Sequence, residues 1–86
     1  MAKATVRYWA AAKEAAGVPE EQVEADTLEE ALSAVTARHE ADPRLTSVLA
    51  RSSFLIDGAP AGTRPAGDIA VGEGSVIEVL PPFAGG

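Results

Sequence analysis

The sequence has 86 residues, no cysteine, and 13 acidic against 7 basic side chains, which gives a formal charge of -6. This length supports one compact core, and the missing thiols exclude disulfides, a cysteine nucleophile and cysteine-based metal sites. The negative charge disfavours nucleic acid and anionic membranes as partners. Because no apolar run reaches the roughly 20 residues of a membrane span and no signal peptide is evident, we expect a soluble, cytoplasmic protein.

The first strand is predicted over residues 4–9, where polar and apolar residues alternate. The alanine-rich segment 10–16 then has the composition of a short helical turn. Gly17 is placed to end this turn in the left-handed conformation, since glycine adopts positive φ without steric cost.

A weaker strand and the clearest helix follow. Residues 20–25 predict an exposed edge strand, protected from aggregation by the charges of Glu21 and Glu24. A capping box beginning at Thr27 starts a helix that we expect to end near Glu40, ahead of a proline. The residues expected to pack this helix on the sheet are apolar and recur at helical spacing: Leu28, Leu32 and Val35.

The second half of the sequence predicts two further strands. Residues 43–51 fit a short helical turn but are too few to assign from sequence. Residues 53–56 predict a buried strand that ends in an Asp57-Gly58 turn. Glycine and proline give 59–74 the character of a loop, and 75–80 predicts the last strand.

The order of these elements predicts an α+β fold, a mixed sheet with one main helix on one face. It fits the β-grasp, the fold of ubiquitin, in which strands 4–9 and 75–80 would lie side by side and parallel at the centre. Residues 1–80 are therefore assigned to a β-grasp domain. Residues 81–86, Pro-Pro-Phe-Ala-Gly-Gly, are assigned to a flexible C-terminal diglycine tail, because two prolines end the last strand.

Four parts of the sequence carry a resemblance to a known family: VRYWAAAKEAAG at 6–17, the helix after Thr27, VGEGSVIEVL at 71–80, and the ending PPFAGG at 81–86. They resemble the MoaD/ThiS-like ubiquitin-like sulfur carriers, and within them the small subunit of molybdopterin synthase. The resemblance spans nearly the whole sequence, and the strand followed by Pro-Pro and the terminal diglycine is its most specific part.

The resemblance implies that the chain is not an enzyme on its own and binds no cofactor. It implies that a ubiquitin-activating-like enzyme uses ATP to adenylate the C-terminal carboxylate of Gly86, which sulfur from a persulfide then converts to a thiocarboxylate. The tail would next enter the large subunit of a heterotetrameric molybdopterin synthase and donate its sulfur to a pterin precursor.

The residue types of the tail suit this chemistry. A carboxylate becomes an acyl donor once it is joined to AMP, and a sulfur nucleophile can then attack it. Gly85 and Gly86 have no Cβ and would fit a narrow, water-excluding channel. Pro81 and Pro82 stiffen the base of the tail, while Phe83, followed by Ala84, could supply an apolar anchor in the partner.

Other functions remain open from the sequence. A carrier for thiazole or cysteine synthesis would use the same tail, and a ubiquitin-like modifier would join Gly86 to a lysine of a target. A passive interaction module is a further alternative, whereas no acid–base pair or nucleophile for an independent enzyme can be assembled. His39 is interpreted as structural, and Trp9 as sheet packing more than a partner contact. An acidic run without an intervening base is interpreted as a solvated face: Glu20, Glu21, Glu24, Asp26, Glu29 and Glu30.

Overall fold

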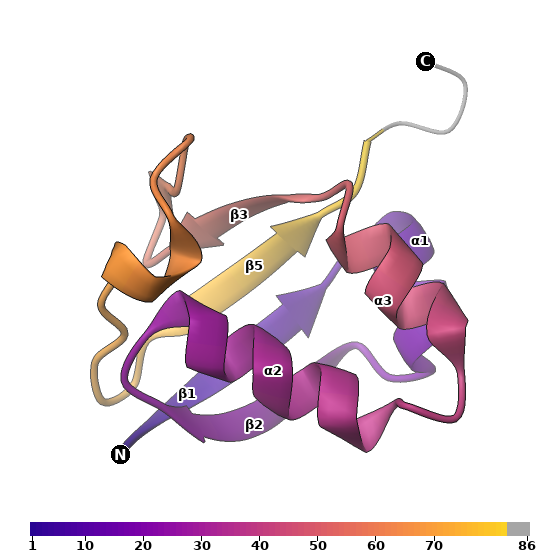
Figure 1. Cartoon of the computed structure of the whole chain (residues 1–86), viewed down its shortest axis with the longest axis horizontal. Helices are drawn as coiled ribbons and strands as arrows, with labels where there is room; N and C mark the ends of the chain where they lie inside the picture. Colours follow the sequence, from indigo (N-terminus) through magenta and orange to yellow (C-terminus); the bar gives the residue numbers. More distant parts are fainter. Residues whose placement is uncertain (83–86) are drawn as a thin grey trace.

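The computed structural model describes residues 1–82, which form a mixed sheet of five strands in the order β2-β1-β5-β3-β4 (Figure 1). The two central strands, β1 and β5, are parallel, and the other neighbours are antiparallel. This arrangement confirms the β-grasp prediction. The strands are β1 Ala2–Tyr8, β2 Glu20–Ala25, β3 Ser53–Ile56, β4 Ala59–Pro60 and β5 Val76–Leu80.

The register of the central pair determines which side chains form the core. Val6 lies opposite Ile77, and Tyr8 lies opposite Val79. All four side chains are almost fully buried, because alternate residues of a strand point to the same face of the sheet. The alternation in the sequence therefore identified the core-facing residues of β1, and β5 was predicted as a strand.

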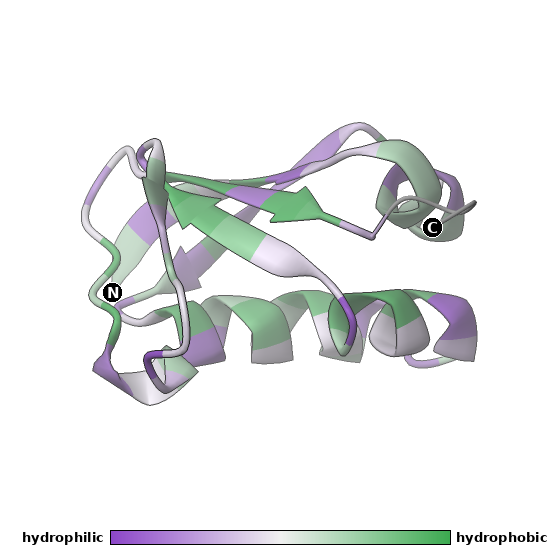
Figure 2. Ribbon diagram, turned by 90° about the horizontal axis from the view of Figure 1, so that it is seen from above, coloured by the Kyte–Doolittle hydropathy of each residue, from purple (hydrophilic) through white to green (hydrophobic). Residues whose placement is uncertain are grey.

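The main helix α2, Leu28–Arg38, lies along one face of the sheet and turns its apolar side toward it (Figure 2). Its start is the predicted capping box: the Thr27 hydroxyl accepts a hydrogen bond from the Glu30 N–H at 3.2 Å, and the Glu30 carboxylate accepts one from the Asp26 N–H at 2.7 Å. The helix ends at Arg38 rather than near Glu40, because His39 leaves helical geometry and caps it.

The buried stripe of α2 differs from the predicted one at a single position. Leu28, Ala31 and Val35 are buried, whereas Leu32 is only partly buried and packs against the margin of the core. Ala31 takes the place nearest the sheet, which moves Leu32 to the margin of the stripe. Leu32 is thus a smaller contributor to the core than its spacing predicted.

Two short helices pack on each other at the end of the sheet where β1 and β5 finish (Figure 1). They are α1, Ala10–Ala16, and α3, Pro43–Leu49, which assigns the ambiguous segment to a helix. Gly17 ends α1 with φ of 78°, as predicted. No helix within residues 1–82 is long and apolar enough to cross a membrane.

The segment expected to be a loop contains more structure than predicted. The Asp57-Gly58 turn, with positive φ at both residues, connects β3 to the two-residue strand β4. A short 3-10 helix, Ala66–Asp68, follows. Neither is visible in the sequence, because two or three residues are too few for a periodic pattern and Pro60 is atypical of a strand.

Candidate functional site

The base of the C-terminal tail is an extension of the central strand β5. Leu80 is the last residue of β5, Pro81 is half-buried, and Pro82 is exposed. Proline has no N–H to donate, so the hydrogen-bond ladder cannot continue through these two residues. The strand therefore delivers the chain to the surface at the end of the sheet where α1 and α3 pack (Figure 1).

The structure locates only part of the predicted site. Pro81 and Pro82 lie at the exit from β5, as expected. The other predicted partner-binding residues, Phe83, Ala84 and Gly85, lie outside the described residues, as does the predicted reactive Gly86, so the expectation of a flexible tail is not tested there.

The face of the sheet opposite α2, which we name the open face, leads directly to the tail base. Leu55, Val76 and Leu80 lie on it and are only partly buried, because their strand neighbours on either side point toward α2 instead. The same face also carries Glu78, between Val76 and Leu80 on β5, and Arg7 opposite it on β1, so it is a mixed apolar and charged surface that ends where the tail begins.

Trp9 borders the open face beside the end of β5. Its side chain is 46% exposed, and its indole Nε1 donates a hydrogen bond to the Glu78 carboxylate at 3.2 Å. The ring is therefore held toward β5 while much of its surface remains in solvent. The sequence favoured sheet packing for Trp9, and the contact with Glu78 holds the ring against β5 while it stays part-exposed.

The structure also brings together a polar cluster that the sequence interpretation missed. Tyr8 and His39 each place a polar atom against the same carboxylate oxygen of Glu21, at 2.6 Å from the hydroxyl and 2.7 Å from Nε2. Arg38 lies 3.7 Å from the other oxygen. Glu21 is thus not a charge guarding the sheet edge but a mostly buried junction between β1, β2 and the end of α2.

The electrostatics of this cluster follow from its burial. Burial raises the pKa of Tyr8, and the hydrogen bond to Glu21 and its negative charge raise it further. Burial also acts to raise the pKa of Glu21, but the hydrogen bonds from Tyr8 and His39 and the charges of His39 and Arg38 together lower it. The cluster faces the core side of the sheet and joins β1, β2 and the end of α2 through these contacts.

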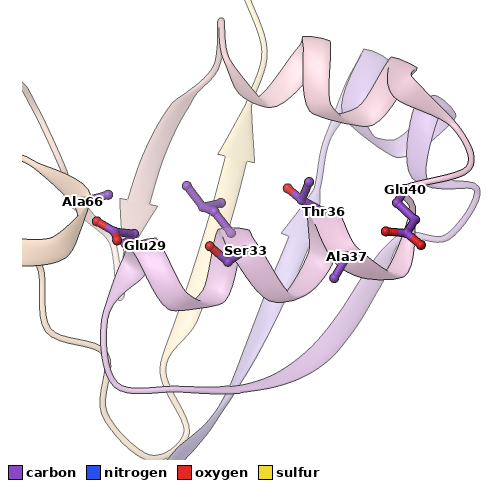
Figure 3. Close-up of a pocket in the computed structure, with 7 residues that line it drawn as sticks. Glu29, Ser33, Thr36, Ala37, Glu40 and Ala66 are labelled. Atoms are coloured by element: carbon purple, nitrogen blue, oxygen red, sulfur yellow. The ribbon is translucent and has the colours of Figure 1, made fainter.

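The outer face of α2 carries a shallow hollow of 420 Å³. Figure 3 shows Ser33, Thr36 and Ala37 along the helix, with Glu29 and Glu40 toward its two ends. Small side chains and two acids supply neither a nucleophile nor a base with a partner. Within residues 1–82 no three His, Cys, Asp or Glu side chains gather closely enough to hold a metal ion.

The model of the ThiS family matches residues 6–86, which is nearly the whole chain and includes the diglycine. The chain belongs to the ThiS family. Membership confirms the resemblance to the ubiquitin-like sulfur carriers on which the sequence interpretation rested. None of the curated proteins matches the chain.

Solved structures support the same fold for this ThiS-family chain. Small archaeal modifier protein 1 from Methanosarcina acetivorans superposes with a TM-score of 0.83 at 24% identity, over 100% of this chain and 98% of that one. A molybdopterin converting factor subunit 1 from Pyrococcus furiosus gives 0.76 at 22%, over 96% and 100%. Subunit 1 in the complex of molybdopterin-converting factor subunits 1 and 2 from Helicobacter pylori gives 0.67 at 23%, over 98% and 99%.

Proposed function

We propose that this ThiS-family chain is a cytoplasmic sulfur carrier that donates sulfur in molybdopterin biosynthesis, as the small subunit of molybdopterin synthase. Its C-terminal Gly86 carboxylate is adenylated by a ubiquitin-activating-like enzyme that consumes ATP, and is then converted to a thiocarboxylate. The carrier contributes the reacting group and binds no cofactor itself. Catalysis belongs to the enzymes that receive the tail.

The observation that carries this proposal is the match of the family model through Gly86, combined with the exit of the tail from the central strand. A core strand is a rigid support, so the tail base has a defined position relative to the open face. From Pro81 to Gly86 the chain can extend about 20 Å, at roughly 3.3–3.6 Å per residue. That reach allows the carboxylate to enter a buried site while the folded domain stays outside.

The open face is the surface on which we propose that the partner receiving the tail binds. Its half-exposed residues Leu55, Val76 and Leu80, with Trp9 beside them, supply apolar surface next to the tail base, and Arg7 and Glu78 supply charges among them. A partner that binds the tail would bury this surface, and removing its apolar part from water would favour binding. The Helicobacter pylori neighbour is a complex of two molybdopterin-converting factor subunits, and we propose a corresponding large subunit, in a heterotetramer, for this chain.

The pathway is tested by sulfur transfer from the thiocarboxylated protein. The loaded carrier is mixed in separate reactions with a molybdopterin synthase large subunit plus pterin precursor, a thiazole synthase, and a cysteine synthase with its substrate. We expect loss of carrier sulfur and formation of a dithiolene in the first reaction only, and no transfer from a carrier lacking Gly86. Preferential transfer in either other reaction, or an isopeptide bond to lysine, would contradict the molybdopterin assignment.

A further inference from the structure

A second hollow, of 340 Å³, lies beside the start of β3, and Leu55 of the open face is one of its lining residues. Leu28, Phe54 and Ala66 contribute apolar walls, and Ser53 and Arg64 contribute polar groups. The lining contains one cation and no carboxylate, on a chain whose formal charge is -6. A concave, mainly apolar surface with one oriented charged group is the usual form of a binding pocket.

Arg64 is oriented by the backbone around it. Its Nε donates a hydrogen bond to the Ala61 carbonyl at 3.1 Å, and one terminal nitrogen donates to the Pro60 carbonyl at 3.2 Å. None of the salt bridges found within residues 1–82 involves Arg64. Because a guanidinium carries five N–H donors, those not directed at the two carbonyls are available to an anion, and a carboxylate is well matched to them.

The position of this hollow indicates what kind of ligand reaches it. Ser53, on its rim, lies opposite Leu80 across β3 and β5, and the tail begins at the next residue. The base of the tail therefore starts one residue beyond the pair that Ser53 forms with Leu80. A carboxylate on a peptide segment of a partner that binds the tail can meet Arg64 while a neighbouring apolar side chain contacts Phe54.

We propose that the Arg64 hollow binds a partner-protein segment in which an acidic residue adjoins an apolar one. The choice of a protein over a free metabolite rests on the proposed function, since it assumes a partner at the tail. The carboxylate pairs with the free edge of the guanidinium, and the apolar side chain fills the space between Phe54, Leu28 and Ala66. The contact adds specificity for the partner without touching Gly86.

The test is an amide-chemical-shift titration of the full-length, isotope-labelled protein with acetyl-Leu-Glu-amide as probe. Acetyl-Leu-Gln-amide is the uncharged match, and sodium acetate is the small-anion control. We expect saturable shifts at Ser53, Phe54 and Arg64 with the acidic peptide, and at least about tenfold weaker binding of the other two probes, since the loss of one charged contact costs about that factor.

Substitutions distinguish two roles of Arg64: binding of the probe's carboxylate, and support of its own loop through hydrogen bonds to the Pro60 and Ala61 carbonyls. Arg64→Gln removes the cation, and Ser53→Glu, at an exposed position, repels the carboxylate while leaving the Arg64 hydrogen bonds in place. Ser33→Glu adds the same charge on the exposed outer face of α2 (Figure 3) and should change nothing. Equal binding of acidic and uncharged peptides, equal binding of acetate, equal weakening by Ser33→Glu, or no saturable shift would each overturn the proposal. The titration uses no activating enzyme, so its failure is distinct from failure of the chemistry at Gly86.

Discussion

Replacing Leu28 with Ala should destabilise the fold far more than the same change at Leu32. Leu28 is 2% exposed and buried in the core, whereas Leu32 is only partly buried. Removing a fully buried leucine side chain costs about 3 kcal/mol, from lost burial of roughly three carbon groups and from the cavity left behind. At Leu32 about half of that burial is lost and the surface can relax, so about 1 kcal/mol is expected.

Thermal and urea unfolding of the two variants measures this difference. For a domain of this size the costs correspond to falls in melting temperature of about 15 °C and about 5 °C, respectively. Because both variants make the same chemical change on the same helix, helix propensity cancels in the comparison. Equal destabilisation by the two substitutions, or a larger effect at Leu32, would refute the observed packing of α2.

The remaining predictions concern the polar cluster, one turn and the tail. Glu21→Gln should lower the free energy of unfolding at neutral pH by about 2 kcal/mol, since it weakens hydrogen bonds to a mostly buried charge. The pKa of Glu21 is lowered by folding, so wild-type stability should be retained above the ordinary glutamate value and fall as pH drops through the folded value. Urea unfolding across acidic pH should show a shallower fall in Glu21→Gln, and parallel curves would contradict the cluster. Gly17→Ala should cost about 1 kcal/mol by thermal unfolding, because φ is 78° with open space around the new Cβ; an unchanged melting temperature would contradict the left-handed cap. Deleting Gly86 should leave the melting temperature unchanged, because the tail lies beyond the last strand, and a fall of several degrees would show that it packs on the domain.

The sequence predicted those elements whose patterns are local. Alternation over β1 identified its buried face, and the capping box at Thr27 located the start of α2. The helix α3 has only seven residues, and its stability comes from packing on α1, so local propensity could not assign it.

Glu21 was misinterpreted although a signal was present. It shares a strand face with Val23 and Ala25, which are both buried, so the period of two already directed it toward α2. The sequence interpretation assigned its charge to protecting the exposed edge strand from aggregation. The residues that hydrogen-bond to it, Tyr8 and His39, are distant in sequence and could not be recognised as its partners.

The candidate site likewise has parts that could be predicted from the sequence and parts that could not. The Pro-Pro exit and the diglycine ending are contiguous in sequence and could be recognised there. The open face and the Arg64 hollow could not, because each depends on the register of β3 against β5 and on the side chains that the register brings together.

The most direct test of the sulfur-carrier assignment is the intact mass of the protein after incubation with an activating enzyme, ATP and a persulfide sulfur donor. Wild type should gain the mass of one oxygen replaced by sulfur, with the change located at Gly86 by fragmentation. A chain lacking Gly86, and one carrying Gly85→Trp, should remain folded and unchanged in mass, since the proposed narrow channel of the activating enzyme would exclude a bulky side chain. Sulfur found on the chain lacking Gly86, or no adenylate and no thiocarboxylate on wild type with any such enzyme, would contradict the account.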